Sequence, residues 1–132
     1  MAELKRWSAH LGIPINLQPK FFPVDETLAA RTIIAVQDDG KDASALIETL
    51  MGDVWLHERD IAEPQTVRDA LIKCDLSAEY LENADLPAIA GIYDANCQAA
   101  RDHNIFGVPS YVVGSELFWG QDRLDFVDRA LS

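Results

Sequence analysis

Apolar residues recur at helical spacing over most of the first hundred positions of this chain. The clearest series runs over residues 42–58, where one stripe is apolar and the opposite face is polar. The stripe consists of Ala43, Leu46, Ile47, Leu50, Met51, Val54 and Trp55. The opposite face carries Lys41, Ser44, Glu48, Thr49 and Asp53. This pattern predicts a helix that packs on a core with its apolar stripe and exposes its polar face to solvent.

Two shorter helices are predicted before this one. The first ends at Gly12, which suits the left-handed residue after a helix. The second covers residues 27–37, with Asp25 as its cap and Gly40 beyond its end. Between them, residues 13–17 alternate apolar and other side chains, so an extended or edge segment is expected there.

Three further helices are predicted after residue 58. Pro64 stands at a first helical position, which it favours because it lacks a backbone N–H. Ser77 caps a short helix, and Pro87 opens a longer one that reaches about residue 103. Strand signals appear only after these helices.

The last quarter of the chain predicts a β-hairpin between a proline turn and a helix. Pro109 leads into an apolar run at residues 110–113, and a second run follows at residues 116–119. Gly114-Ser115 is a two-residue turn signal between them. Gly120-Gln121-Asp122 then opens a helix, whose free N–H groups can hold an anion. The chain is therefore expected to be α+β and predominantly helical, with helices packed on a small sheet.

Length and net charge limit the number of domains and the classes of partner that we expect. The chain has 132 residues, which predicts one domain, residues 1–132. We divide it into residues 1–24, 25–86 and 87–132. A net charge of -11 repels phosphate backbones and anionic lipid, so neither nucleic acid nor membrane is an expected partner. No signal-peptide pattern or membrane-length apolar run occurs, and we expect a cytoplasmic protein.

The candidate chemistry is not that of a redox pair or a metal site. Cys74 and Cys97 are far apart and form no Cys-x-x-Cys motif, so both are expected to be small buried residues. The histidines His10, His57 and His103 show no metal-type spacing, and no metal is expected.

Two segments carry a family resemblance, residues 106–113 and 117–124, which contain Gly107-Val108-Pro109 and Gly120-Gln121-Asp122. They resemble the closing part of a thioredoxin-like fold. The DsbA-like branch with 2-hydroxychromene-2-carboxylate isomerases and kappa-class glutathione transferases is the most similar. The resemblance implies a C-terminal ββα unit joined to a helical insertion, over nearly the whole chain.

The resemblance also implies a glutathione site. The Val108-Pro109 peptide would be cis, and the backbone of Val108 would hold the cysteinyl part of glutathione. The N–H groups at Gln121 and Asp122 would receive the γ-glutamyl carboxylate, and the Asp122 side chain its ammonium. Trp119 would wall a substrate pocket. On the local pattern alone, Pro109 is also an ordinary turn proline, Asp122 an ordinary helix cap and Trp119 a core residue.

Two departures from the family pattern bear on activity. The opening strand-helix-strand unit, which carries the family's nucleophile-positioning serine, is expected to be missing, so no catalytic residue is assigned. Asp25 stands where relatives carry Asn, and its interpretation as a helix cap is preferred. Two strands alone form a marginal sheet, so another surface must complete it. A third strand at residues 13–17, a separately encoded half or a second copy would do so, and a homodimer is favoured.

Three functions remain open. The first is a shortened family member that binds glutathione without catalysis. The second is a glutathione-dependent isomerase or transferase whose site a dimer partner completes. The third is a non-catalytic dimeric interaction protein, because fold resemblance alone does not choose among functions.

Overall fold

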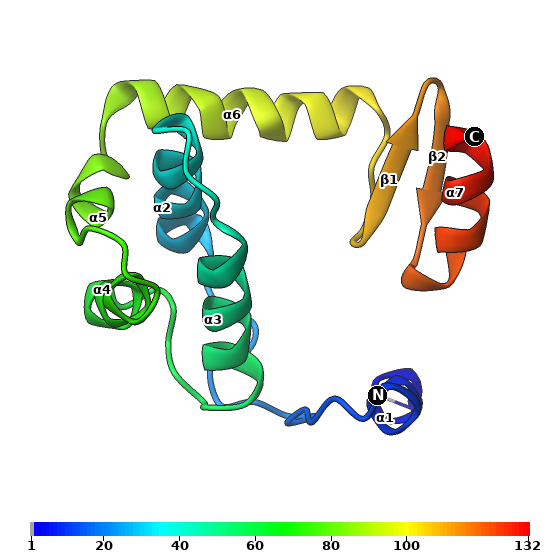
Figure 1. The fold of residues 1–132 in the computed structure, drawn as a ribbon, viewed down its shortest axis with the longest axis horizontal. Helices are drawn as coiled ribbons and strands as arrows, with labels where there is room; N and C mark the ends of the chain where they lie inside the picture. The colour runs from blue at the N-terminus through cyan, green and yellow to red at the C-terminus, as the bar shows by residue number, and fades with distance from the viewer. Residues whose placement is uncertain (1) are drawn as a thin grey trace. The chain divides into compact units, whose positions relative to one another are not determined.

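A computed structural model describes residues 2–132, and these contain helices, one hairpin and a short 3-10 turn (Figure 1). The elements are α1 (Ala2–Leu11), α2 (Thr27–Asp38), α3 (Ser44–Trp55), α4 (Pro64–Lys73), α5 (Glu79–Asn83), α6 (Pro87–Asp102), β1 (Ser110–Val113), β2 (Glu116–Trp119), η1 (Gln121–Arg123) and α7 (Leu124–Leu131). The fold is a mostly helical α+β arrangement, as predicted.

The chain forms two compact units. The first is Met1–Tyr93 and the second is Asp94–Ser132, so α6 begins in one and continues into the other. The second unit holds the hairpin and α7, which the sequence placed in the closing thioredoxin-like part. The assignment of residues 1–132 to one domain stays a prediction. No helix within residues 2–132 combines the length and apolar character needed to cross a bilayer.

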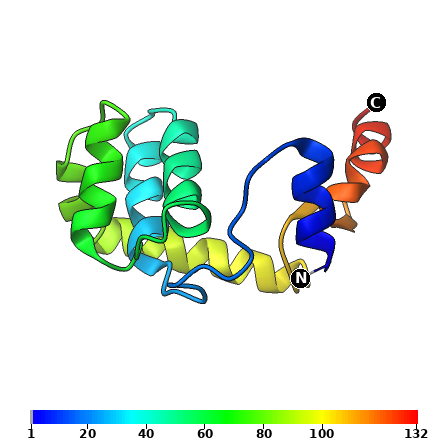
Figure 2. The same cartoon turned by 90° about the horizontal axis from the view of Figure 1, so that it is seen from below.

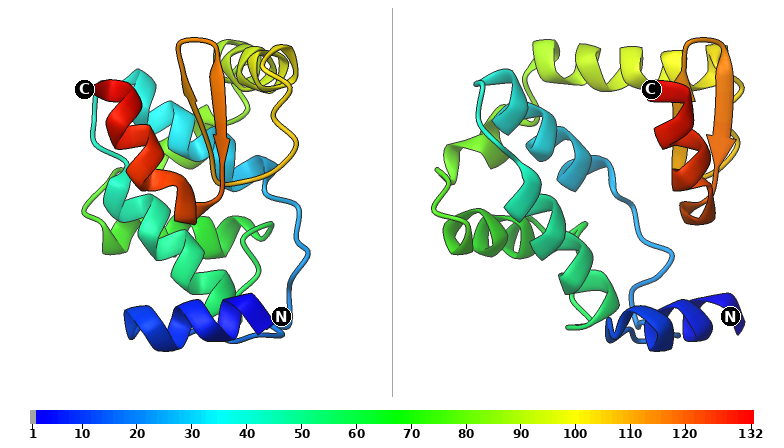
Figure 3. Two further views of the ribbon diagram at one scale, coloured as in Figure 1. Left: turned by 90° about the vertical axis from the view of Figure 1, so that its right-hand side faces the viewer. Right: turned by 45° about the vertical axis from the view of Figure 1, so that its right-hand side comes forward.

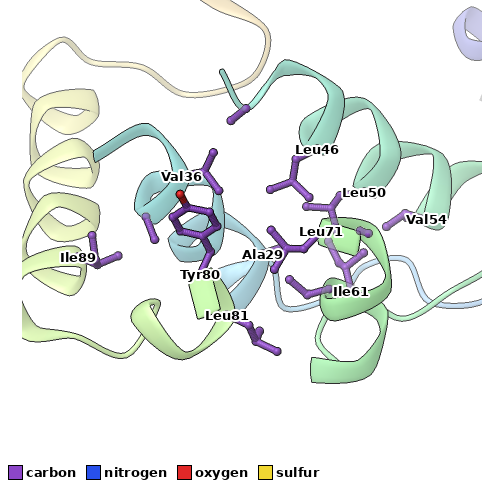
Figure 4. Packing of buried hydrophobic residues seen from close by; sticks show 14 residues of the cluster. Ala29, Val36, Leu46, Leu50, Val54, Ile61, Leu71, Tyr80, Leu81 and Ile89 are labelled. Carbon is purple, nitrogen blue, oxygen red and sulfur yellow. The ribbon is translucent and has the colours of Figure 1, made fainter. Parts of the chain in front are cut away.

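The core of the first unit lies among α2, α3, α4 and α5 (Figures 1 and 2). Helix α2 packs against each of the other three, and α3 also packs on α4. Several side chains at the centre are fully enclosed, among them Val36, Leu46 and Leu71 (Figure 4), each at 0% exposure. These helices are therefore held by shared burial of apolar surface, which is the main favourable term in folding.

Helix α3 departs from its predicted orientation. Leu46, Leu50 and Val54 are buried as predicted, but Ile47 and Met51 of the same stripe are 37% and 58% exposed. Asp53, expected on the solvent face, is only 4% exposed. The apolar stripe is wider than the surface that α2 and α4 cover, so one edge of it is left outside the core.

Arg59 compensates the buried carboxylate. Its Nη1 lies 3.7 Å from Oδ1 of Asp53, and its backbone N–H donates to the Asp53 carbonyl over 2.8 Å. Its Nη2 also donates to Asp69 over 2.6 Å. A buried charge is retained where a partner of opposite sign approaches it, and the loop after α3 supplies that partner.

Residues 13–17 form no strand, so the third strand that the sequence suggested for this segment is absent. The only sheet in residues 2–132 is the pair β1–β2. The backbone N–H of Asn16 donates instead to the carbonyl of Trp55 over 2.7 Å, and its side chain donates to Glu58 over 2.6 Å. Pro14 interrupts the segment, and it runs as an irregular connection beside the end of α3. Helix α1 buries none of its residues.

The second unit is built on an antiparallel hairpin with α7 packed beside β1 (Figure 3). The register pairs Ser110 with Trp119 and Val113 with Glu116, as the two-residue turn predicts. Val127 of α7, at 9% exposure, is the one buried apolar side chain that the structure describes in this unit. The remaining apolar residues of the hairpin and of α7 are half-buried or exposed.

Asp39, just after α2, joins two elements of the first unit. The Tyr80 hydroxyl of α5 donates to its carboxylate, and Lys41 Nζ lies 3.2 Å from the same oxygen. The hydrogen bond from Tyr80, followed by the contacts from Lys41, lowers the pKa of Asp39 below its ordinary value of 3.8. A carboxyl with a lowered pKa stabilises the fold above that value, and the contribution disappears as pH falls through the folded-state pKa.

Substitution of Tyr80 should therefore change stability in a pH-dependent way. Tyr80→Phe removes the donor, so its free energy of unfolding should fall below wild type at pH 7. The difference should shrink as pH falls below 3.8, and it should vanish only below the lowered folded-state pKa, where the carboxyl is protonated in both states. Urea titrations at several pH values measure this. Tyr93→Phe is the control, and a pH-independent deficit in Tyr80→Phe would contradict the assignment.

Adjacent residues of α4 test the position of the core. Leu71 is fully enclosed, whereas Ile72 is 59% exposed. Leu71→Ala should lower the free energy of unfolding by about 2–5 kcal/mol, because it leaves a cavity. Ile72→Ala should change it by about 0.5 kcal/mol or less. Equal losses in chemical denaturation would show that α4 does not pack as described.

Candidate functional site

The hairpin register brings the predicted site residues to one end of the sheet. Because Ser110 pairs with Trp119, the next residues outward on the two strands are Pro109 and Gly120. The Gly120 N–H donates to the Pro109 carbonyl over 2.9 Å, which extends the ladder by one bond. Val108 precedes this bond on one side and Gln121 follows it on the other. The two segments that carry the predicted site residues therefore lie side by side at this end of the hairpin.

The turn before β1 presents an open backbone. The Val108-Pro109 peptide bond is cis. The Ser110 hydroxyl donates to the Gly107 carbonyl over 2.6 Å and closes the turn from the inside. Val108 is 88% exposed, and neither its N–H nor its C=O is paired with another group of residues 2–132. One free donor and one free acceptor on the same residue can pair with an extended peptide, as at a sheet edge.

The turn after β2 presents free donors and a carboxylate. Gly120 has φ 110° and ψ 147°, a region that is open essentially to glycine alone. The N–H groups of Gln121 and Asp122 begin η1 and have no partner within their helix. Asp122 folds back towards Gly120, and Arg123 Nη2 lies 3.6 Å from its Oδ2. That ion pair is about half exposed, so it is weak and an incoming cation can replace it.

Trp119 and Phe106 form an aromatic wall beside these turns. Their ring centroids are 5.1 Å apart at an interplanar angle of 59°. Trp119 is 53% exposed and Phe106 70%, so neither is a core residue. A Cβ added at Gly107 would lie 2.9 Å from the Trp119 Nε1, so the Trp119 ring would have to shift to admit another residue there. Sequence reasoning missed the parts played by Phe106 and Gly107, although their place next to Val108-Pro109 was a usable signal.

Asp25 precedes α2 and caps its start. It lies in the first unit, where its Oδ1 accepts a hydrogen bond from the Thr27 N–H over 2.9 Å at the start of α2. Hydrogen bonds from the Thr27 backbone and then from its side chain lower the pKa of Asp25. This agrees with the interpretation of Asp25 as a cap. Cys74 and Cys97 form no disulfide and are half-buried, where the sequence predicted buried residues.

The whole chain, residues 1–132, matches the family described as DSBA-like thioredoxin domain. The chain belongs to this family. A 2-hydroxychromene-2-carboxylate isomerase of Sphingobium xenophagum is 30% identical over 133 residues, covering 99% of this chain and 66% of that protein. Glutathione S-transferase kappa 1 of Homo sapiens is 28% identical over 142 residues, covering 98% of this chain and 63% of that protein.

The structural comparison agrees on the fold. A solved 2-hydroxychromene-2-carboxylate isomerase superposes with a TM-score of 0.74 at 24% identity, over 98% of this chain and 63% of that one. This DSBA-like domain therefore spans slightly less than two thirds of the length of the relatives it matches. The resemblance in residues 106–124 is confirmed at the level of family and fold.

Gly120 should be the least replaceable residue of the site. Gly120→Ala should destabilise the hairpin by about 1–3 kcal/mol, because alanine is strained at this backbone conformation. An added Cβ would also lie 2.5 Å from Asp122 Oδ1. Amide hydrogen exchange of β1 and β2 measures the loss locally. Gly114→Asn is the control, because Gly114 has φ 60° with open space around it. Equal protection in both variants would contradict the strained turn.

Proposed function

We propose that this DSBA-like domain binds glutathione at the end of its hairpin, through Val108, Pro109, Gln121 and Asp122. The observation that supports this most is the Pro109–Gly120 hydrogen bond, because it sets the two predicted halves of the site side by side. The name of the human relative, glutathione S-transferase kappa 1, supports the same ligand.

The available groups complement the ligand. The cysteinyl residue of glutathione has a backbone N–H and C=O, which the free C=O and N–H of Val108 would pair with. The γ-glutamyl end has a carboxylate and an ammonium. The carboxylate would accept from the first N–H groups of η1, where the helix dipole also favours an anion. The ammonium would take the place of Arg123 beside Asp122.

This arrangement binds a thiol and does not by itself activate it. A low thiol pKa needs a cation, a hydroxyl donor or a helix N-terminus next to the sulfur. We assign none of these roles to a residue of this chain, so catalysis is left outside the proposal. If a second copy completes the site, the relatives' names suggest isomerase or transferase chemistry. The substrate would then lie beside the wall formed by Trp119 and Phe106.

Asp122 provides the sharpest test of glutathione binding. Asp122→Asn should weaken it by about tenfold, the loss expected for one charge-assisted hydrogen bond of about 1.5 kcal/mol. Asp128→Asn removes the same charge from an exposed position on α7 and should bind like wild type. Cysteinylglycine lacks the γ-glutamyl group and should not distinguish Asp122→Asn from wild type. Isothermal titration calorimetry measures glutathione binding to the three proteins and cysteinylglycine binding to wild type and Asp122→Asn.

Two results would contradict the proposal. One is an absence of glutathione binding to the wild-type protein. The other is an equal effect of Asp122→Asn and Asp128→Asn on affinity. Such a result would show that only the net charge matters and that Asp122 does not contact the ligand. Val108→Ala should leave affinity unchanged in either case, because the proposed contacts use its backbone.

A second candidate is a dimeric interaction protein without a ligand. It is favoured by the exposure of Phe106, Val108 and Trp119, at 70%, 88% and 53%, on a sheet of two strands. Such a surface is stabilised when another chain covers it. Light scattering distinguishes the candidates, because a dimer with no glutathione binding leaves only this one.

A further inference from the structure

A second hollow lies within the first unit. It measures about 770 Å³ and is formed by α3, residues 13–15 and Leu4 of α1. Every residue that lines it is apolar or glycine except Ser44 and Glu48. A hollow of this size with few polar groups is typical of sites for small molecules, which occupy about 300–1,000 Å³. We refer to it below as the α3 groove.

The α3 groove exists because part of the α3 stripe is left outside the core. Ile47 and Met51 are 37% and 58% exposed, and Ile13 across the groove is 57% exposed. A smaller apolar hollow of about 240 Å³ continues from it and shares Ile47, Met51 and Trp55. The apolar surface is thus one strip along α3, and such strips on a folded unit mark binding sites more often than isolated exposed residues do.

The charges along this strip have one sign. Glu48 is the charged residue of the α3 groove, and Glu26 is that of the smaller hollow. Within residues 2–132, neither carboxylate has a cation as an ion-pair partner. The chain as a whole carries a net charge of -11, which raises the local concentration of cations and repels anions.

We propose that the α3 groove binds a hydrophobic amine. The apolar body of the ligand lies against Ile47, Met51 and Trp55, and its ammonium group pairs with Glu48. Burial of the apolar body supplies most of the affinity, and the carboxylate selects the sign of the head group. This site is independent of the proposed glutathione site and involves none of its residues.

Charge also argues against other occupants of the groove. An anionic hydrophobe would place its head group next to Glu48. A second copy joined by a two-fold axis would present the same patch twice, so both Glu48 carboxylates would enter one interface. A cation on an apolar body satisfies the apolar lining and the carboxylate together.

Three probes with the same apolar body separate these cases. They are 4-phenylbutylamine, 4-phenylbutanol and 4-phenylbutanoate, which carry a positive, a neutral and a negative end. The protein is labelled at its methionine methyl groups and followed by NMR, with the Met51 resonance identified by comparison with Met51→Leu. The Met51 signal should move saturably with the amine, less with the alcohol and least with the carboxylate.

Two glycine variants test the place of binding. A Cβ at Gly52 meets no atom within 4 Å, so Gly52→Leu should fold and fill the groove that this residue lines. Gly91→Leu is the matched control in α6, where a Cβ also meets nothing within 4 Å. Binding of the amine should be lost in Gly52→Leu and retained in Gly91→Leu.

Glu48 tests the selection by charge. Glu48→Gln should lower the affinity for 4-phenylbutylamine by about two- to fivefold, as expected for the loss of one exposed ion pair. Glu48→Lys should reverse the order, so that 4-phenylbutanoate binds more tightly than the amine. Both substitutions lie on the exposed side of α3 and leave the core intact.

Several results would overturn the proposal. These are equal affinity of wild type for amine and carboxylate, equal behaviour of Gly52→Leu and Gly91→Leu, and an unchanged preference in Glu48→Lys. A Met51 signal that moves with protein concentration alone would assign the groove to a second copy. Tighter binding of a basic amphipathic peptide than of the amine would assign it to a partner helix.

Discussion

The pairing of β1 with β2 is the constraint on which the candidate site depends. A hairpin with a two-residue turn allows one register, and that register sets Pro109 opposite Gly120. A slip by one residue would turn every side chain to the other face and separate Val108 from Gln121 and Asp122. The candidate site is therefore set by backbone hydrogen bonding, and the positions of its side chains depend on the hairpin register. Gly107 and Gly120 allow the close approach because neither carries a Cβ.

The first unit follows a different principle. Its four-helix core of α2 to α5 is held by non-directional burial, so each helix takes the orientation that covers most apolar surface. Helix α3 has more apolar surface than its neighbours cover, and it buries Asp53 against Arg59 while Ile47 and Met51 stay exposed. The uncovered strip along α3 is thus a product of the packing. Its acidic surroundings give that strip a preference for cations.

Local signals predicted most of the elements well. Prolines at helix starts, glycines after helix ends and the Gly114-Ser115 turn are short-range features, and Pro64, Gly12 and the hairpin lie where such rules place them. The alternation in residues 13–17 was misleading, because a strand needs a partner and Asn16 pairs with the end of α3 instead. The face of α3 was also partly wrong, since helical periodicity defines a stripe and says nothing about how wide its covering surface is.

By itself, the sequence determined the helices and the hairpin, because caps, turns and periodicity act within a few residues of chain. It also contained the family signal in residues 106–124, and with it the candidate residues Val108, Gln121 and Asp122. Only the tertiary structure decided that Phe106 stacks on Trp119, that Asp39 accepts a hydrogen bond from Tyr80, and that Asp53 lies inside while Met51 lies outside. Phe106 with Trp119 and Asp39 with Tyr80 join residues far apart in sequence, and which side of α3 is covered depends on its neighbours. The sequence pattern of one segment does not determine which of its side chains another segment will bury.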